Sequence, residues 1–281
     1  MNLIVRADDM GYSEAYNLGY LEAIRNGIVT CAELMVDMPG AEQAACMLQE
    51  FPWIPVGIHL HLCGRPCADP KLIPTLIGED GFLNVKYTRN AGKDFSLDEL
   101  YIEGKAQIER FIKLMGRKPD VISNASDADT TYYEAFRILI EEYKINYLKA
   151  HVYYKWIETN DGFTVKAYPV KPLISGREGK EWGTINDQFI NYKPENIFLE
   201  YNEAAYDDDD YYYTVFHPGY LDGFIMNNSR LTVGRCKDVD ACTSVVVKTK
   251  LREKNVKLIT CNDLMFGTND YQNFMNTRNL K

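Results

Sequence analysis

Short apolar runs alternate with amphipathic stretches along most of this chain, and that alternation constrains the fold more than any other feature. Residues 3–7 and 54–62 are apolar runs of strand length, whereas apolar side chains recur at helical spacing through residues 13–27. Strands that alternate with helices build a mainly parallel sheet covered by helices. We therefore expect an α/β fold in which residues 1–281 form a single barrel-like (β/α) domain.

The other predicted elements continue this order. Further strands are predicted over residues 28–36, 121–122, 145–148, 211–217 and 256–260, and further helices over residues 41–48, 96–116, 132–143, 195–205 and 239–253. Ser96 and Glu99 have the spacing of a capping box, which predicts where the third helix starts. Residues 63–95 are too long for an ordinary connection and predict a loop over a functional site. Residues 150–210 are the least assignable segment.

The composition excludes several classes of protein. A net charge of −9, with no run of Lys or Arg longer than two, argues against nucleic acid and anionic membranes as partners. No segment approaches the roughly 20 apolar residues of a bilayer span, and the first residues lack the pattern of a signal peptide. Seven scattered cysteines predict reduced thiols and a cytoplasmic protein. A homodimer stays open as the oligomeric state.

Two acidic residues directly follow the first predicted strand. Asp8 and Asp9 precede Gly11, which permits a tight turn at the carboxyl end of that strand. In parallel α/β barrels this end of the strands carries the chemistry, so the pair fits a general base and a metal ligand. The alternative is that one carboxylate caps the turn while the other is solvated.

Histidines mark two other predicted strands. His59 and His61 alternate within the run at 54–62, so both imidazoles face one side and could bind a metal together. The alternative is one buried structural histidine and one at the strand end. His217 ends the predicted strand at 211–217, where an imidazole could act as a general acid near neutral pH or make a structural hydrogen bond.

Several motifs together resemble a known family. They are VRADDMGYS at residues 5–13, VGIHLHL at 56–62, GRKP at 116–119 and FHPGYLD at 216–222. The combination resembles the YdjC-like carbohydrate deacetylases, which include chitooligosaccharide deacetylases. The resemblance implies a barrel-like fold and metal-dependent removal of an acetyl group from an N-acetylated sugar or oligosaccharide, with magnesium or zinc as the metal. A small carbohydrate would then be the ligand.

The resemblance also implies roles for individual residues. Asp8 matches the base of the family, and Asp9 and His59 match two metal ligands. His217 matches the histidine near the carboxyl-terminal end of the site. If these residues have the roles that the resemblance implies, two carboxylates and two imidazoles from three strands form the catalytic centre.

The third metal ligand does not carry over in the same way. Ala125 stands where the family has a histidine, and a methyl group cannot coordinate a metal. His61, or an oxygen of Asp127, could take this place, and an oxygen ligand would suit magnesium. The other reading is a catalytically impaired member of the family that binds a carbohydrate without turnover.

Two further residues are candidates for binding substrate. Arg65 lies just beyond the His59 strand, where it could meet a polar or anionic substituent, and Asp222 lies five residues beyond His217, where it could also orient that imidazole. A glycosidase on the same fold is a competing function. It would need two carboxylates that flank a glycosidic bond, and Asp8 with Asp9 is the one obvious pair.

Overall fold

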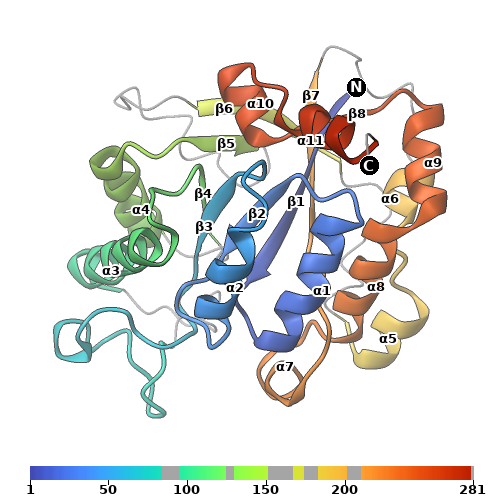
Figure 1. Ribbon diagram of the computed structural model, residues 1–281. Coiled ribbons are helices and arrows are strands. Elements are labelled where there is room, and N and C mark those ends of the chain that lie inside the picture. The colour runs from blue at the N-terminus through green and yellow to red at the C-terminus, as the bar shows by residue number, and fades with distance from the viewer. Residues whose placement is uncertain (84–94, 125–129, 151–166, 174–182, 201–209, 280–281) are drawn as a thin grey trace.

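A computed structural model of the chain describes residues 1–83, 95–124, 130–150, 167–173, 183–200 and 210–279 (Figure 1). The centre is one eight-stranded sheet made of β1 (Asn2–Met10), β2 (Cys31–Leu34), β3 (Val56–Leu60), β4 (Ile122–Asn124), β5 (Tyr147–Ala150), β6 (Ala167–Pro172), β7 (Tyr211–Phe216) and β8 (Lys257–Leu258). The predicted α/β fold is confirmed.

The strands are paired in parallel in the order β4-β3-β2-β1-β7-β6-β5, and β8 pairs with the start of β1. A parallel bridge between Val121 and Asn146, just before β4 and β5, links the two outer strands. The sheet thus curves until its outer strands meet at this bridge, and we call this shape a half-barrel. The carboxyl ends of its parallel strands lie at one edge of it. That edge is where parallel barrels place their functional side chains.

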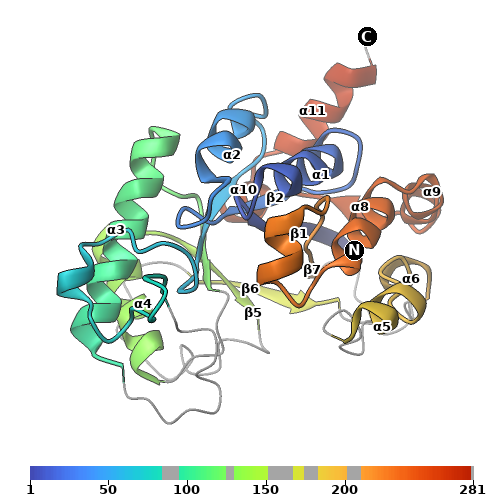
Figure 2. The same cartoon turned by 90° about the horizontal axis from the view of Figure 1, so that it is seen from below.

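Helices surround this sheet in both views of the molecule (Figure 2). They are α1 (Glu14–Arg25), α2 (Ala41–Leu48), α3 (Leu97–Met115), α4 (Thr130–Tyr143), α5 (Ile185–Ile190), α6 (Asn196–Leu199), α7 (Gly223–Asn228), α8 (Val233–Thr243), α9 (Val245–Glu253), α10 (Cys261–Phe266) and α11 (Asp270–Asn279), with a short 3-10 helix at Pro70–Leu72. Helices α3 and α4 pack together, and α1 packs against α8.

Strand β1 lies at the centre of the hydrophobic core. Leu3, Ile4 and Val5 are fully buried, because β2 and β8 flank this strand on one side and β7 on the other while helices cover the sheet. A strand buried on both faces reads as a continuous apolar run, which explains why its sequence signal is strong. The run ends where the charged pair Asp8 and Asp9 begins.

The first three predicted helices begin where the sequence places them, but the cap predicted for the third is wrong. Helix α1 follows Ser13, whose hydroxyl accepts a hydrogen bond from the Tyr16 backbone, and α2 matches its predicted range. Helix α3 follows Ser96, but the predicted capping box is wrong because the Ser96 side chain makes no capping hydrogen bond. Glu99 instead accepts two hydrogen bonds from Thr75, so a tertiary contact replaces the local one.

Other differences lie in the second half of the chain. The helix predicted at 239–253 is two helices, α8 and α9, divided at Ser244, whose side chain caps α9. Strand β6 and helix α5 lie within the segment that resisted assignment, and α10 and α11 follow the last predicted strand. The predicted helix at 195–205 is described only as α6, since residues 201–209 lie outside the described part.

The described helices show no membrane-spanning candidate, because none of them is both long enough and apolar enough to cross a bilayer. All seven cysteines are free thiols, in agreement with the sequence expectation. Cys31 and Cys261 are buried neighbours whose sulfur atoms lie 3.3 Å apart.

Gly219 allows the turn after β7 to pass close to α1, and this contact generates a prediction. A Cβ atom at Gly219 would lie 1.9 Å from the Tyr16 ring, whereas nothing lies within 4 Å of a Cβ at Gly223. We expect Gly219→Ala to lower the free energy of unfolding by about 1–3 kcal/mol, the usual cost of overpacking. Urea denaturation with Gly223→Ala as the matched control measures this, and equal stability of both variants would contradict the packing argument.

Candidate functional site

The site begins at the carboxyl end of β1, where two neighbouring aspartates reach different partners. Asp9 has a φ of 68°, in the left-handed region that few residues other than glycine adopt, and the register between β1 and β2 shifts at this point. Asp8 pairs with Arg6 through two contacts, Nε to Oδ1 at 2.8 Å and Nη2 to Oδ2 at 2.9 Å. The irregular backbone directs Asp9 to other groups.

Asp9 lies between two nitrogen atoms from distant parts of the chain. Its Oδ2 accepts a hydrogen bond from Arg235 Nη1 at 2.9 Å, and its Oδ1 lies 3.4 Å from His59 Nε2. Burial alone would raise the pKa of Asp9, but the Arg235 cation, with His59 and His217, holds it well below its usual range. Asp9 is therefore an ionised carboxylate, with one oxygen bound to Arg235 and the other facing His59.

His59 is oriented by a chain of side chains on the two neighbouring strands. Its Nδ1 lies 2.8 Å from Ser123 Oγ on β4, and Ser123 donates its proton to Glu33 Oε2 on β2 at 2.9 Å. The direction of the contact between His59 and Ser123 depends on the tautomer of His59. In the tautomer with its proton on Nδ1, the ring donates to Ser123 and the lone pair of Nε2 faces the Asp9 carboxylate.

Glu33 is fully buried in the interior of the half-barrel. Burial is the main reason that the pKa of this carboxyl group lies well above its usual range. Gly57 makes room for it, since a Cβ atom at Gly57 would lie 2.4 Å from the Glu33 carboxylate. A side chain on β3 at this position would therefore displace the group that supports Ser123 and His59.

Asp9 and His59 fit two ligands of one divalent cation. Two ligands at about 2.1 Å from a tetrahedral metal lie about 3.4 Å apart, which is the separation of Asp9 Oδ1 and His59 Nε2. An imidazole lone pair that faces a carboxylate also requires a cation or proton between them. Metal-binding histidines commonly donate their other ring N–H to a polar partner, and Ser123 is such a partner for His59 in the tautomer with its proton on Nδ1.

His61 lies beside His59, but its partners come from other parts of the chain: the segment after β2, the loop after β3, and α3. The two rings are nearly parallel, with centroids 6.5 Å apart, and His61 Nδ1 lies 3.9 Å from Asp37 Oδ2. The neighbouring Gln107 side chain holds the His61 backbone. Burial alone would lower the pKa of His61, but contacts with Cys63 and Asp37 raise it well above its usual range.

No three His, Cys, Asp or Glu side chains form a metal-binding group within the part of the chain that the structure describes. The sequence candidate Asp127, and Ala125 at the position of the expected histidine, lie outside the described residues. The identity of a third ligand, including His61, stays a prediction.

His217 follows β7, the strand that pairs with β1. Its backbone N–H donates a hydrogen bond to Asp238 Oδ2 at 2.7 Å, and its side chain is close enough to Asp9 to help lower the pKa of that carboxylate. Parallel pairing of β1 and β7 thus places Asp9 and His217 at the same edge of the sheet, as the sequence predicts for adjacent parallel strands.

The two predicted substrate-binding residues have different environments. Arg65 is exposed, and its guanidinium lies 5.9 Å from the centre of the Phe82 ring. Asp222 is the N-cap of α7, where its carboxylate accepts a hydrogen bond from the Ile225 backbone at 2.9 Å. Arg65 is thus available at the surface, whereas this capping bond occupies one oxygen of Asp222.

Sequence reasoning missed two residues of α8 that hold this site. Arg235 is buried between the rings of Tyr12 and Tyr16, whose centres lie 4.9 and 4.8 Å from its guanidinium carbon. Asp238 is buried and accepts the His217 hydrogen bond. No local motif marks either residue, because Arg235 and Asp9 are 226 positions apart.

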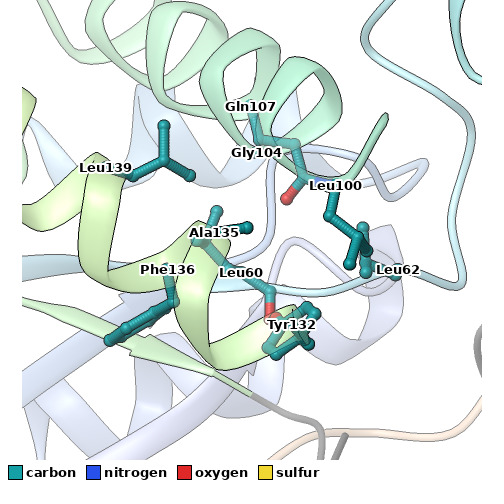
Figure 3. A pocket seen from close by; sticks show the side chains of 9 residues that line it. All are labelled: Leu60, Leu62, Leu100, Gly104, Gln107, Tyr132, Ala135, Phe136 and Leu139. Carbon is teal, nitrogen blue, oxygen red and sulfur yellow. The ribbon is translucent and has the colours of Figure 1, made fainter. Parts of the chain in front are cut away.

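A small apolar cavity lies on the other side of β3, between α3 and α4 (Figure 3). Leu60 and Leu62 alternate with the two histidines and face Leu139 and Gly104 of these helices. Its volume of about 10 Å³ is room for about one water molecule. The cavity is therefore a small gap in the packing of α3 and α4 against β3. The candidate functional residues lie elsewhere, at the carboxyl edge of the sheet.

Comparison with known proteins places this site in context. Residues 2–253 match the family described as YdjC-like protein. Carbohydrate deacetylase 2 of Listeria innocua serovar 6a is 29% identical over 284 residues, covering 94% of this chain and 99% of the relative. Chitooligosaccharide deacetylase of Serratia marcescens is 38% identical over 124 residues, covering 43% of this chain and 48% of that protein.

The chain is also similar to a crystal structure from Enterococcus faecalis V583, described as that of a proposed cellobiose-phosphate cleavage protein. The TM-score is 0.75 at 22% identity, covering 94% of this chain and 98% of the other. At this identity the likeness shows the fold alone, and it agrees with the parallel half-barrel.

The ionised state of Asp9 predicts a pH effect on stability. Its pKa in the folded protein lies well below the 3.8 of an ordinary aspartate, so its stabilising contribution is present above that value and is lost as the pH falls through the lowered pKa. We expect Asp9→Asn to be less stable than the parent near neutral pH and to lose less stability between about pH 5 and pH 3. Urea denaturation at several pH values across this range measures both effects. If the free energy of unfolding of both proteins changed equally with pH, the ionised state of Asp9 would be contradicted.

The Ser123 contact predicts an effect on metal binding. Ser123→Ala removes the hydrogen-bond partner of His59 Nδ1, and loss of such a partner typically weakens metal affinity about 10- to 100-fold. Calorimetric titration of the metal-free protein with Zn²⁺ measures the change. Ser96→Ala is the matched control, because the Ser96 side chain makes no capping hydrogen bond. If both variants bound Zn²⁺ with equal affinity, Ser123 would have no role in metal binding.

Proposed function

Because the chain belongs to the YdjC-like family, we propose that it is a hydrolase that removes the acetyl group from an N-acetylated sugar. The family match over residues 2–253 and the relatives named carbohydrate deacetylase support this function. The observation that carries it is the juxtaposition of Asp9 Oδ1 and His59 Nε2 at 3.4 Å beside a second aspartate, Asp8. Such a group is suited to amide hydrolysis assisted by a divalent cation.

Asp9 and His59 would hold the cation, with magnesium and zinc as the two candidates. When bound, a divalent cation supplies a Lewis acid for the acetamide oxygen and lowers the pKa of coordinated water. With the His59 proton on Nδ1, Ser123 keeps the Nε2 lone pair aimed at Asp9, and Arg235 keeps Asp9 ionised. The protein therefore presents a preformed pair of ligands.

Asp8 is the proposed general base. Its carboxylate is nearly buried and is held by Arg6 through both oxygens, so its orientation is fixed before substrate binds. A carboxylate in this place can accept the proton of an attacking water molecule.

His217 is the proposed general acid. Its imidazole can carry a proton near neutral pH and donate it to the departing amine, which leaves as an amino sugar while acetate is released. The hydrogen bond from its backbone to Asp238 fixes the turn at the end of β7. Arg65, exposed beyond β3, is a candidate for contact with a polar or anionic substituent of the sugar.

A glycosidase fits the same site less well. Such an enzyme needs two carboxylates with separate roles on either side of a glycosidic bond. Here Arg235 holds Asp9 ionised, so Asp9 cannot serve as the neutral acid of that reaction, and both oxygens of Asp8 contact Arg6.

Acetate release from N-acetylglucosamine oligomers, measured with Mg²⁺ or Zn²⁺ present, tests this function. We expect Asp8→Asn to lower the rate by about 100- to 10,000-fold, the usual contribution of a general base, while sugar affinity is retained. Asp98→Asn, an exposed aspartate in the first turn of α3, is the matched control. Full activity of Asp8→Asn would remove Asp8 from the mechanism.

The substitution at Ala125 supports one alternative, a family member that binds a carbohydrate without turnover. Sugar binding by the parent protein without acetate release would favour it. In that case Ala125→His should produce acetate release, because it supplies the missing imidazole. Acetate release by the parent that Ala125→His leaves unchanged would indicate that another side chain already completes the ligand set.

A further inference from the structure

One turn of helix α8 contacts the carboxyl ends of two neighbouring strands, β1 and β7, which carry proposed functional residues. Arg235 and Asp238 are three residues apart on this helix, so they project from the same face. Arg235 bonds to Asp9 at the end of β1, and Asp238 bonds to the backbone of His217 at the end of β7. Strands β1 and β7 are neighbours in the sheet.

The Arg235 guanidinium is held from several directions. Its Nε donates to Leu231 O at 2.9 Å and its Nη2 to Ser229 Oγ at 3.2 Å, which leaves Nη1 directed at Asp9 Oδ2. The rings of Tyr12 and Tyr16 also lie against it. A planar fork fixed in this way has one orientation, so it fixes the direction in which the Asp9 carboxylate is held.

The direction of this contact matters because the two oxygens of Asp9 have different partners. With φ at 68°, the residue lies outside the regular strand geometry of β1. Arg235 binds Oδ2, and the remaining oxygen, Oδ1, is the one that lies 3.4 Å from His59 Nε2. The orientation of the proposed ligand pair thus depends on Arg235, a residue of α8.

Asp238 acts in the same way on the other strand. One oxygen accepts the His217 backbone N–H at 2.7 Å, and the other accepts the Tyr192 hydroxyl at 2.6 Å. The backbone of α8 makes a second contact with the turn after β7, because Gly219 N–H donates to Arg235 O at 3.2 Å. The turn that carries His217 is therefore bound to α8 at two points.

We propose that Arg235 and Asp238 are positioning residues, which hold Asp9 and His217 at a fixed separation across the site. Arg235 sets the direction of the Asp9 carboxylate, and Asp238 sets the backbone of His217. This inference rests on the proposed function only in the roles of ligand and acid that it gives to these two residues.

The test compares Arg235→Lys and Asp238→Asn with two matched controls, Arg230→Lys and Asp240→Asn, whose side chains are exposed. Lysine keeps the charge but lacks the fork, and asparagine keeps the shape but loses one acceptor oxygen. We expect Arg235→Lys to weaken Zn²⁺ binding to the metal-free protein at least tenfold. We expect Asp238→Asn to lower kcat for acetate release at least tenfold with little change in KM.

The ring signals of the four histidines in NMR spectra of the metal-free protein give a readout that needs neither metal nor activity. Arg235→Lys should shift the His59 signal and Asp238→Asn the His217 signal, while the controls shift neither. A merely structural role would lower the melting temperature and leave these signals unchanged in the folded variants, which would overturn the proposal. If the parent releases no acetate but the shifts occur, positioning stands and the deacetylase assignment fails.

Discussion

The buried ion pair between Asp9 and Arg235 is the interaction on which the rest of the site depends. It joins the first strand to a helix 226 residues later, and both side chains are almost completely removed from water. Loss of one partner of such a pair typically costs about 3–5 kcal/mol, because the other charge stays buried and uncompensated. The pair therefore links the stability of the fold to the direction of the proposed metal ligand.

A second constraint is the row of polar side chains across the interior of the half-barrel. Arg6 with Asp8 on β1, and Glu33 with Ser123 on β2 and β4, occupy space that a barrel usually fills with apolar groups. Each of these contacts supports either the proposed base or the proposed ligand His59. The interior thus exchanges apolar packing for a set of hydrogen bonds that fixes the functional groups before any ligand binds.

The sequence predicts best those elements whose patterns depend on nearby residues. The apolar run of β1 and the Ser13 cap of α1 could be predicted because their patterns depend on burial and on one adjacent turn. Asp8 and Asp9 followed from the rule that the carboxyl ends of parallel strands carry the chemistry, whereas the pairing of Asp9 with His59 followed from the family resemblance. The structure brings Asp9 and His59 within 3.4 Å of each other, and a shared cation stays a prediction.

The parts that sequence could not provide depend on long-range contacts or on conflicting local signals. The sequence predicts that Glu99 caps the start of α3, but in the structure its carboxylate accepts hydrogen bonds from Thr75 instead. Strand β6 contains Pro169 and Pro172, which weaken a strand prediction. Arg235 sits in a helix with no motif, and only the folded chain brings it to Asp9.

The central claim is that Asp9 and His59 share one divalent cation while Arg235 holds the other oxygen of Asp9. Anomalous X-ray diffraction from crystals soaked in Zn²⁺ tests it most directly. The account predicts a peak about 2.1 Å from both Asp9 Oδ1 and His59 Nε2, with Arg235 still bound to Oδ2. A peak elsewhere, or none while these two atoms keep their separation of 3.4 Å, would contradict it.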